Sequence, residues 1–118
     1  MIYIPPLIRL NEAQQNEVIR VAELLKGCNF DLEVWSERLG YELIEVEEIH
    51  PARAMLYDNY IIVAKATKLE MIMWIAHEHC HATFHADCIT YKEMNKFLAG
   101  RNEGQAIEFS RCVVEELS

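Results

Sequence analysis

The sequence predicts an α+β domain with N-terminal helices, a small and mainly antiparallel three-stranded sheet, and C-terminal helices. Three observations predict this class. Apolar residues recur at helical spacing before residue 40, short β-rich segments follow between residues 41 and 63, and helix-capping signals return after residue 66. The chain has 118 residues and no repeat or Gly/Ser linker divides it. We therefore expect residues 1–118 to form a single domain.

Two helices are expected before the sheet. Asn11 can cap the first, which runs to Lys26, and Gly27 follows as a stop signal. The second is shorter, covers residues 32–39, and lies between the cap residue Asp31 and Gly40. Both helices begin at a side chain that can accept a hydrogen bond from a free backbone N–H.

Three strands are expected next. Residues 41–49 alternate between apolar and acidic side chains, and residues 54–57 and 60–63 flank the turn pair Asp58-Asn59. The first strand carries a cluster of glutamates, for which a solvated strand face is the expected role and an acidic docking surface the alternative. The cluster consists of Glu42, Glu45, Glu47 and Glu48.

Capping boxes predict the C-terminal helices. Thr67 with Glu70 opens a helix over residues 68–84, and Thr90 with Glu93 opens another that Gly100 would close. Asn102 with Gln105 offers a similar capping signal, so a last helix is expected over residues 102–117. On the 68–84 helix the residues expected to face the core are Leu69, Ile72, Met73, Ala76, Cys80 and Phe84.

Composition narrows the possible partners and the compartment. The formal charge is −8 and the basic residues are scattered, so nucleic acid is not expected as a partner. The opening MIYIPPLIRL has no cationic start and contains two prolines, so we expect neither a signal peptide nor a membrane span, and a cytoplasmic location. The four cysteines form no CxxC pair and are expected as reduced thiols.

The run from His77 to His81, HEHCH, matches the pattern H-E-x-x-H on a predicted helix. Histidines four residues apart lie one turn above the other and can share one Zn²⁺. Glu78 is then placed to act as the catalytic base, whereas His79 points to the opposite side and cannot join the same ion. The alternative is a set of solvated histidines on a helix flank.

A catalytic zinc needs a third protein ligand. Glu103 falls on the apolar side of the predicted last helix, where a carboxylate requires a partner. The alternative is that Glu103 only favours the positive end of the helix dipole. Asp87, Glu93 and Glu108 are weaker candidates.

These residues resemble the ImmA/IrrE-type zinc metallopeptidases of bacteria, phages and other mobile elements. AHEHCHATFH from Ala76 stands where the family has A-H-E-L-G-H-x-x-x-H, and EGQAIEF from Glu103 stands where it has E-x-x-A-N-x-F. The resemblance implies a minimal zincin-like domain with zinc on His77, His81 and Glu103, a gluzincin-like ligand set, and Glu78 as the base. It also implies that His85, the trailing histidine, makes a polar contact near the cleft.

The chain departs from the family pattern at three positions. Cys80 replaces a glycine and is expected as a buried inert thiol, and His79 replaces the usual leucine. Ile107 replaces the usual Asn or Asp, which would remove a hydrogen bond that orients a ligand. Trp74 is expected either to line a substrate groove or to pack at the edge of the core.

The expected function is therefore a zinc-dependent endopeptidase that cleaves a specific regulatory protein such as a repressor. Its partners would be a protein or peptide substrate and a regulatory protein, with no nucleic acid and no membrane. The alternative is a non-catalytic protein-binding module of a phage or mobile element in which zinc is structural or vestigial. A metal buffer built on the histidine-rich tract is a third and weaker hypothesis.

Overall fold

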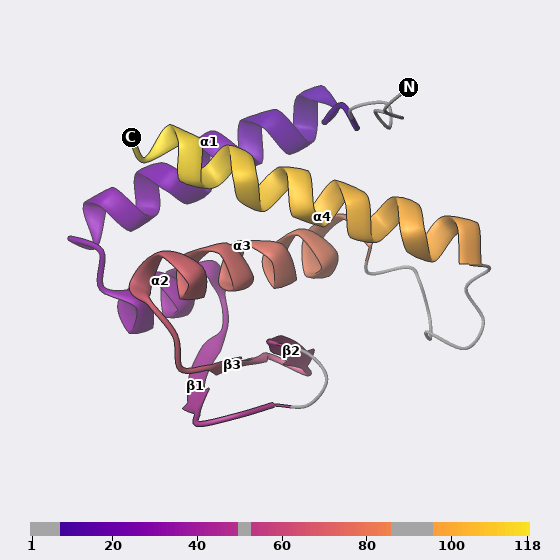
Figure 1. Ribbon diagram of the computed structural model, residues 1–118. Coiled ribbons are helices and arrows are strands. Elements are labelled where there is room, and N and C mark those ends of the chain that lie inside the picture. Colours follow the sequence, from indigo (N-terminus) through magenta and orange to yellow (C-terminus); the bar gives the residue numbers. More distant parts are fainter. Residues whose placement is uncertain (1–7, 50–52, 86–95) are drawn as a thin grey trace, which may run out of the picture.

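The computed structural model describes residues 8–49, 53–85 and 96–118 (Figure 1). Within these ranges the chain forms four helices and one three-stranded sheet, which confirms the α+β class. Helix α3 lies between helix α4 on one side and the sheet on the other (Figure 1). None of the described helices is both long enough and apolar enough to cross a membrane.

The two N-terminal helices begin and end where their capping residues predict. Helix α1 (Glu12–Gly27) starts with a capping box, in which the Asn11 side chain accepts the Gln14 N–H and the Gln14 side chain accepts the Asn11 N–H. Helix α2 (Leu32–Leu39) starts at Asp31 and ends at Gly40, whose φ of 101° is left-handed. These local signals were sufficient because each involves residues within four positions of one another.

The sheet is mixed, so the expectation of a mainly antiparallel sheet was wrong. Strands β1 (Glu42–Val46), β2 (Ala54–Tyr57) and β3 (Tyr60–Ala64) lie in the order β1-β3-β2. The turn at residues 58–59 makes β2 and β3 antiparallel, as predicted, but β1 pairs with β3 in parallel. The first strand also ends at Val46 rather than at residue 49. The apolar run of β3 explains the order, because a strand without polar alternation is suited to the centre of a sheet.

The C-terminal part differs from the two helices expected there. Helix α3 (Lys68–Phe84) is capped by Thr67 as predicted, but helix α4 (Lys96–Glu116) is continuous through Gly100 and Asn102. The predicted break was wrong because one glycine costs a helix only about 1 kcal/mol, and the buried residues Ala106, Phe109 and Val113 hold α4 against the core. The proposed helix start at Thr90 and Glu93 lies outside the described residues.

The core face of α3 is wider than its predicted stripe. Ile72, Ala76 and Cys80 are buried as expected, whereas Leu69 and Met73 are 53% and 38% exposed. Helix α3 packs against α2, α4 and the sheet, so residues outside the predicted stripe are buried as well. These are Met71, Ile75, His77 and His79.

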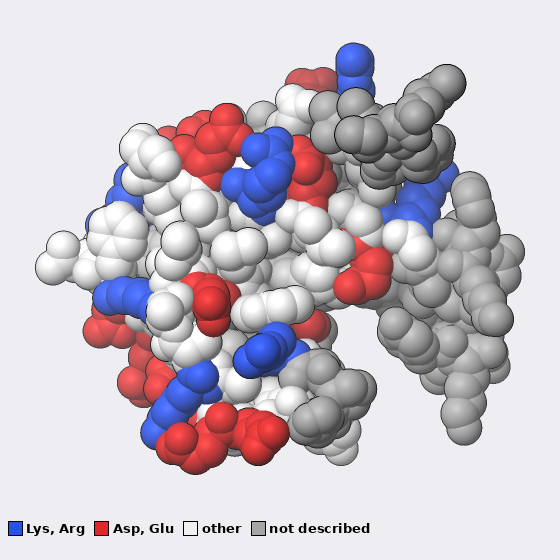
Figure 2. Space-filling model, in the orientation of Figure 1, with Lys and Arg blue, Asp and Glu red and all other residues white. Residues whose placement is uncertain are grey.

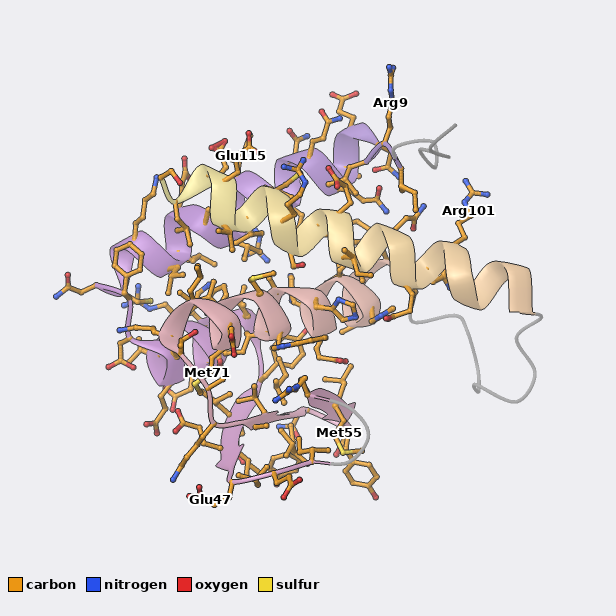
Figure 3. The ribbon with its side chains drawn as sticks, in the orientation of Figure 1. Arg9, Glu47, Met55, Met71, Arg101 and Glu115 are labelled. Carbon is orange, nitrogen blue, oxygen red and sulfur yellow. The ribbon has the colours of Figure 1, made fainter. Side chains whose placement is uncertain are left out.

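Charged side chains of both signs are scattered among uncharged residues on the face of the molecule in Figure 2. The four glutamates of the β1 segment are exposed, as expected for a solvated strand face, and Glu47 forms an ion pair with Lys65. Figure 3 places Glu47 and Met55 at the sheet, and Met55 on the edge strand β2 is 44% exposed. The described cysteines, Cys28, Cys80 and Cys112, are free thiols, as predicted for them, and Cys88 lies outside the described residues.

Candidate metal centre

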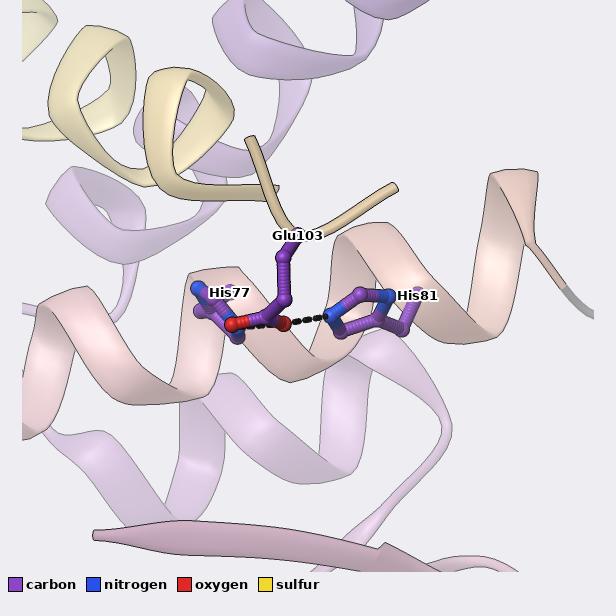
Figure 4. A group of neighbouring side chains, drawn as sticks. All are labelled: His77, His81 and Glu103. Atoms are coloured by element: carbon purple, nitrogen blue, oxygen red, sulfur yellow. Dashed lines mark hydrogen bonds and ion pairs between the residues drawn. The ribbon is translucent and has the colours of Figure 1, made fainter. Parts of the chain in front are cut away.

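His77, His81 and Glu103 converge between α3 and α4 and are called the metal group below (Figure 4). The two imidazoles lie one turn apart on α3, with ring centroids 4.9 Å apart. Glu103 approaches from α4, and its Oε1 atom lies 2.8 Å from Nε2 of His77 and 2.6 Å from Nε2 of His81. All three residues predicted as ligands are therefore brought together by the fold.

The size and chemistry of the metal group fit a zinc ion. The three ligand atoms all lie within 4.8 Å of one another. Zinc bound at about 2.0–2.1 Å in tetrahedral geometry separates its ligand atoms by about 3.3 Å, so the contacts of Glu103 Oε1 with His77 and His81, at 2.8 and 2.6 Å, would lengthen by about 0.5–0.7 Å. Two histidines and one glutamate are also a donor set of catalytic zinc sites, in which a fourth position stays open.

The electrostatics of the metal group favour its ligating forms. Burial lowers the pKa of His81, which keeps this imidazole neutral near pH 7. Burial alone would raise the pKa of Glu103, but its interactions with His81 and His77, the hydrogen bond from His81 being the largest of them, outweigh that effect and the pKa is lowered. A neutral imidazole beside an ionised carboxylate is the combination that a zinc ion requires.

Glu78 lies beside the metal group on α3 and is half-buried. Burial, and to a smaller extent the negative charge of Glu103, raise the pKa of Glu78 from its ordinary 4.5 to about 7. A cation held by the metal group would oppose this shift, because a nearby positive charge favours the ionised carboxylate. A carboxyl group with a pKa near neutrality is able both to accept and to return a proton.

His85 contacts His81, a member of the metal group, and does not itself belong to that group. Its Nδ1 atom lies 2.9 Å from Nδ1 of His81, and its Nε2 atom lies 2.8 Å from Oε1 of Gln105 on α4. The polar contact that was expected for His85 is thus with His81, one of the predicted ligands. Gln105 was missed as a site residue because the sequence suggested only a capping role for it.

His79 points away from the metal group, as its position on the helix predicts. It is 3% exposed, and its ring bonds to Glu17 Oε2 at 2.7 Å and to the Tyr41 hydroxyl at 2.9 Å. Sequence reasoning missed Glu17 and Tyr41 as partners. The sequence did indicate that such partners exist, because a polar side chain such as His79 needs hydrogen-bond partners when its side of the helix is buried.

Trp74, Cys80 and Ile107, which lie on the same two helices as the metal group, differ in how deeply they are buried. The ring of Trp74 lies 5.3 Å from that of His77 and is partly buried against the core. Cys80 is fully buried, and burial raises the pKa of its thiol to about 12, which makes it unreactive as expected. Ile107, at the position where the resembling family has a polar residue, is 57% exposed.

The weaker candidates for the third ligand do not join the metal group. Glu108 instead pairs with Arg111, with Oε1 and Nη2 2.6 Å apart. Asp87 and Glu93 lie outside the described residues. Glu103 is the only carboxylate that the described part of the chain brings into a metal-binding group with His77 and His81.

Comparisons with protein-family models, with curated proteins and with solved structures each found no match. Functional inference for this chain therefore depends on the geometry of the metal group and of the residues around it.

Proposed function

We propose that the chain is a zinc-dependent peptidase with the ligand arrangement of the ImmA/IrrE type. The observation that carries the proposal is the convergence of His77 Nε2, His81 Nε2 and Glu103 Oε1 beside the carboxyl group of Glu78. Imidazole ligands favour zinc over magnesium or calcium, which prefer sites made of oxygen atoms. We also propose that the domain is zincin-like, because its H-E-x-x-H motif resembles that of the family.

Each residue has a defined task in the proposed reaction. When bound, zinc would act as a Lewis acid toward a water molecule and the substrate carbonyl. Glu78 accepts a proton from the attacking water and passes it to the amide nitrogen of the leaving group. His77, His81 and Glu103 hold the ion, and Glu103 also brings a negative charge that limits the net positive charge of the site.

The edge strand β2 supports an extended peptide as the substrate. The N–H of Ala64 donates to the carbonyl of Arg53, which fixes the pattern of hydrogen bonds between β2 and β3. The N–H and C=O groups of Ala54 and Leu56 then point away from β3. Strand β2 also packs against α3, so a peptide added to this edge would run beside the helix that carries the metal group. A regulatory protein such as a repressor is proposed as the source of this peptide on the resemblance alone.

Metal content is the first test of the proposal. Mass spectrometry on tag-free protein is expected to find one zinc per chain in the wild type and little or none in Glu103→Ala. Glu108→Ala is the matched control, because this carboxylate lies on the same helix and pairs with Arg111. A wild type without stoichiometric zinc, after purification with zinc in the buffer, contradicts the proposal.

Catalysis is tested separately from metal binding. Glu78→Gln is expected to keep its zinc and to lose peptide hydrolysis by about 10²-fold or more, since general acid–base catalysis contributes about that much. Full hydrolysis by Glu78→Gln would contradict the role assigned to this residue.

The alternative is a non-catalytic binding module with a structural zinc. The exposed glutamates on the β1 segment, in a chain of formal charge −8, are the feature that favours it. A Glu78→Gln variant that keeps both its zinc and its full biological effect would support this alternative over peptidase action.

A further inference from the structure

We propose that His85 and Gln105 are positioning residues that hold His81 in the tautomer that binds zinc. They belong to a chain of hydrogen bonds, called the relay below, that runs from helix α1 to the metal group. Its members are Gln14, Gln105, His85 and His81. This inference rests on the zinc site proposed above, in which the relay would fix the orientation of His81.

The relay begins at the start of α1, at a backbone N–H group that can act only as a hydrogen-bond donor. The backbone N–H of Asn11 can only donate, and it lies 2.9 Å from the Gln14 side chain, so Gln14 must present its oxygen there. The amide nitrogen of Gln14 is thereby turned toward Gln105, at 3.4 Å from Oε1. Gln14 is 3% exposed, and its backbone N–H is bonded to the Asn11 side chain, so this orientation is held in place.

The orientation of Gln14 determines that of Gln105. An amide nitrogen can only donate, so Gln105 must present its oxygen to Gln14. The same oxygen lies 2.8 Å from Nε2 of His85. His85 must therefore carry its hydrogen on Nε2, and in the neutral ring Nδ1 is left as an acceptor.

The last step reaches the ligand. Nδ1 of His85 lies 2.9 Å from Nδ1 of His81, and only one of these two nitrogens can supply the hydrogen between them. In the zinc-loaded protein, the ion would take the place of the hydrogen between Nε2 of His81 and Oε1 of Glu103, which lie 2.6 Å apart. Since His85 accepts, the remaining hydrogen of His81 is then on Nδ1, which donates to His85. This is the tautomer that a metal bound at Nε2 requires, and partners of this kind also fix the orientation of the ring.

Zinc affinity tests the relay without any assay of catalysis. We would measure the dissociation constant by competition with a chromophoric chelator for the wild type, His85→Ala and Gln105→Leu. Each substitution is expected to weaken zinc binding about 10–100-fold, the usual effect of losing a partner of a ligand. The double variant is expected to lose little more than either single variant, because both substitutions interrupt the same chain.

Two further variants separate positioning from a general effect on folding. Gln105→Glu keeps an oxygen that accepts from His85 and is expected to bind zinc within a few-fold of the wild type. Gln15→Leu is the matched control, since the Gln15 side chain also bonds at the start of α1, to the Leu10 carbonyl at 2.8 Å, but takes no part in the relay. Circular dichroism of the metal-free variants checks that each is folded.

Nitrogen NMR provides a spectroscopic readout that a purely structural role would not produce. In the zinc-loaded wild type, long-range ¹H–¹⁵N spectra are expected to show the hydrogen of His85 on Nε2, with a mixture of tautomers in Gln105→Leu. A hydrogen on Nδ1 of His85, or zinc affinities of His85→Ala and Gln105→Leu equal to that of Gln15→Leu, would overturn the relay alone. A wild type that binds no zinc would overturn the proposed function as well.

Discussion

Nε2 of His79 lies 2.7 Å from Oε2 of Glu17, which joins α3 to α1 on the side of α3 away from the metal group. The Tyr41 hydroxyl bonds to the other ring nitrogen of His79, and Arg20 pairs with Glu17. Hydrogen bonds from Arg20 and His79 lower the pKa of Glu17 although burial opposes them, so Glu17 is ionised near neutral pH. Helix α3 is thus held by a carboxylate on each side, by Glu17 and by Glu103.

His79→Ala is expected to lower the free energy of unfolding by about 2–3 kcal/mol. The substitution removes the two hydrogen bonds that the buried His79 ring makes, with Glu17 Oε2 and with the Tyr41 hydroxyl, and opens a small cavity, although Glu17 keeps its pair with Arg20. Urea denaturation at pH 7 in the presence of a chelator measures the change. Lys65→Ala is the control and is expected to have no measurable effect, because its ion pair with Glu47 is exposed. Equal stability of His79→Ala and the wild type would contradict a structural role for His79.

Glu78→Gln is expected to stabilise the metal-free protein at alkaline but not at acidic pH. The pKa of Glu78 is about 7 in the folded state and near 4.5 when unfolded, so the unfolded chain loses its proton first as the pH rises. Stability due to Glu78 therefore falls between about pH 4.5 and 7, by at most about 3 kcal/mol at 1.4 kcal/mol per pKa unit. Urea denaturation at pH 5 and pH 8 measures the difference. A gain of the same size at both values would contradict the raised pKa.

Gly100→Ala is expected to stabilise the protein by about 0.5–1 kcal/mol. Gly100 lies inside α4, and among the described residues no atom beyond its chain neighbours and its own helix backbone lies within 4 Å of a Cβ added there, so alanine brings only its better helix propensity. Gly40→Ala is the contrasting variant and is expected to destabilise by about 1–2 kcal/mol, because the φ of Gly40 is 101°. Thermal unfolding followed by circular dichroism measures both. A loss of stability in Gly100→Ala would instead support a helix end at this residue.

Zinc is expected to stabilise the folded chain, and a chelator to reverse the effect. A ligand that binds only the folded state at about 100 times its dissociation constant adds about 2.7 kcal/mol. Thermal unfolding with zinc and then with excess chelator measures the shift in the midpoint. Glu103→Gln is expected to lose most of this shift and Glu108→Gln to keep it, since only Glu103 belongs to the metal group. An equal shift in both variants would place the ion elsewhere.

The candidate site illustrates which steps sequence reasoning can make. His77 and His81 could be paired from their spacing alone, because the helical period places residues four apart on one face. Glu103 could be proposed from the apolar side of its own helix, although the motif and Glu103 are more than twenty residues apart. Gln105 and Glu17 could not be found in this way, because their roles depend on contacts with His85 and His79 across helix packing.

By itself the sequence determined where α1, α2 and α3 begin and that two histidines share one face of α3. These properties depend on capping and periodicity, which involve residues within four positions of one another. Only the tertiary structure decided that β1 pairs in parallel with β3, that α4 continues through Gly100, and that Glu103 meets His77 and His81. The physical reason is that packing between distant segments outweighs the small local preferences of single residues, and it alone brings together groups that are far apart in the chain.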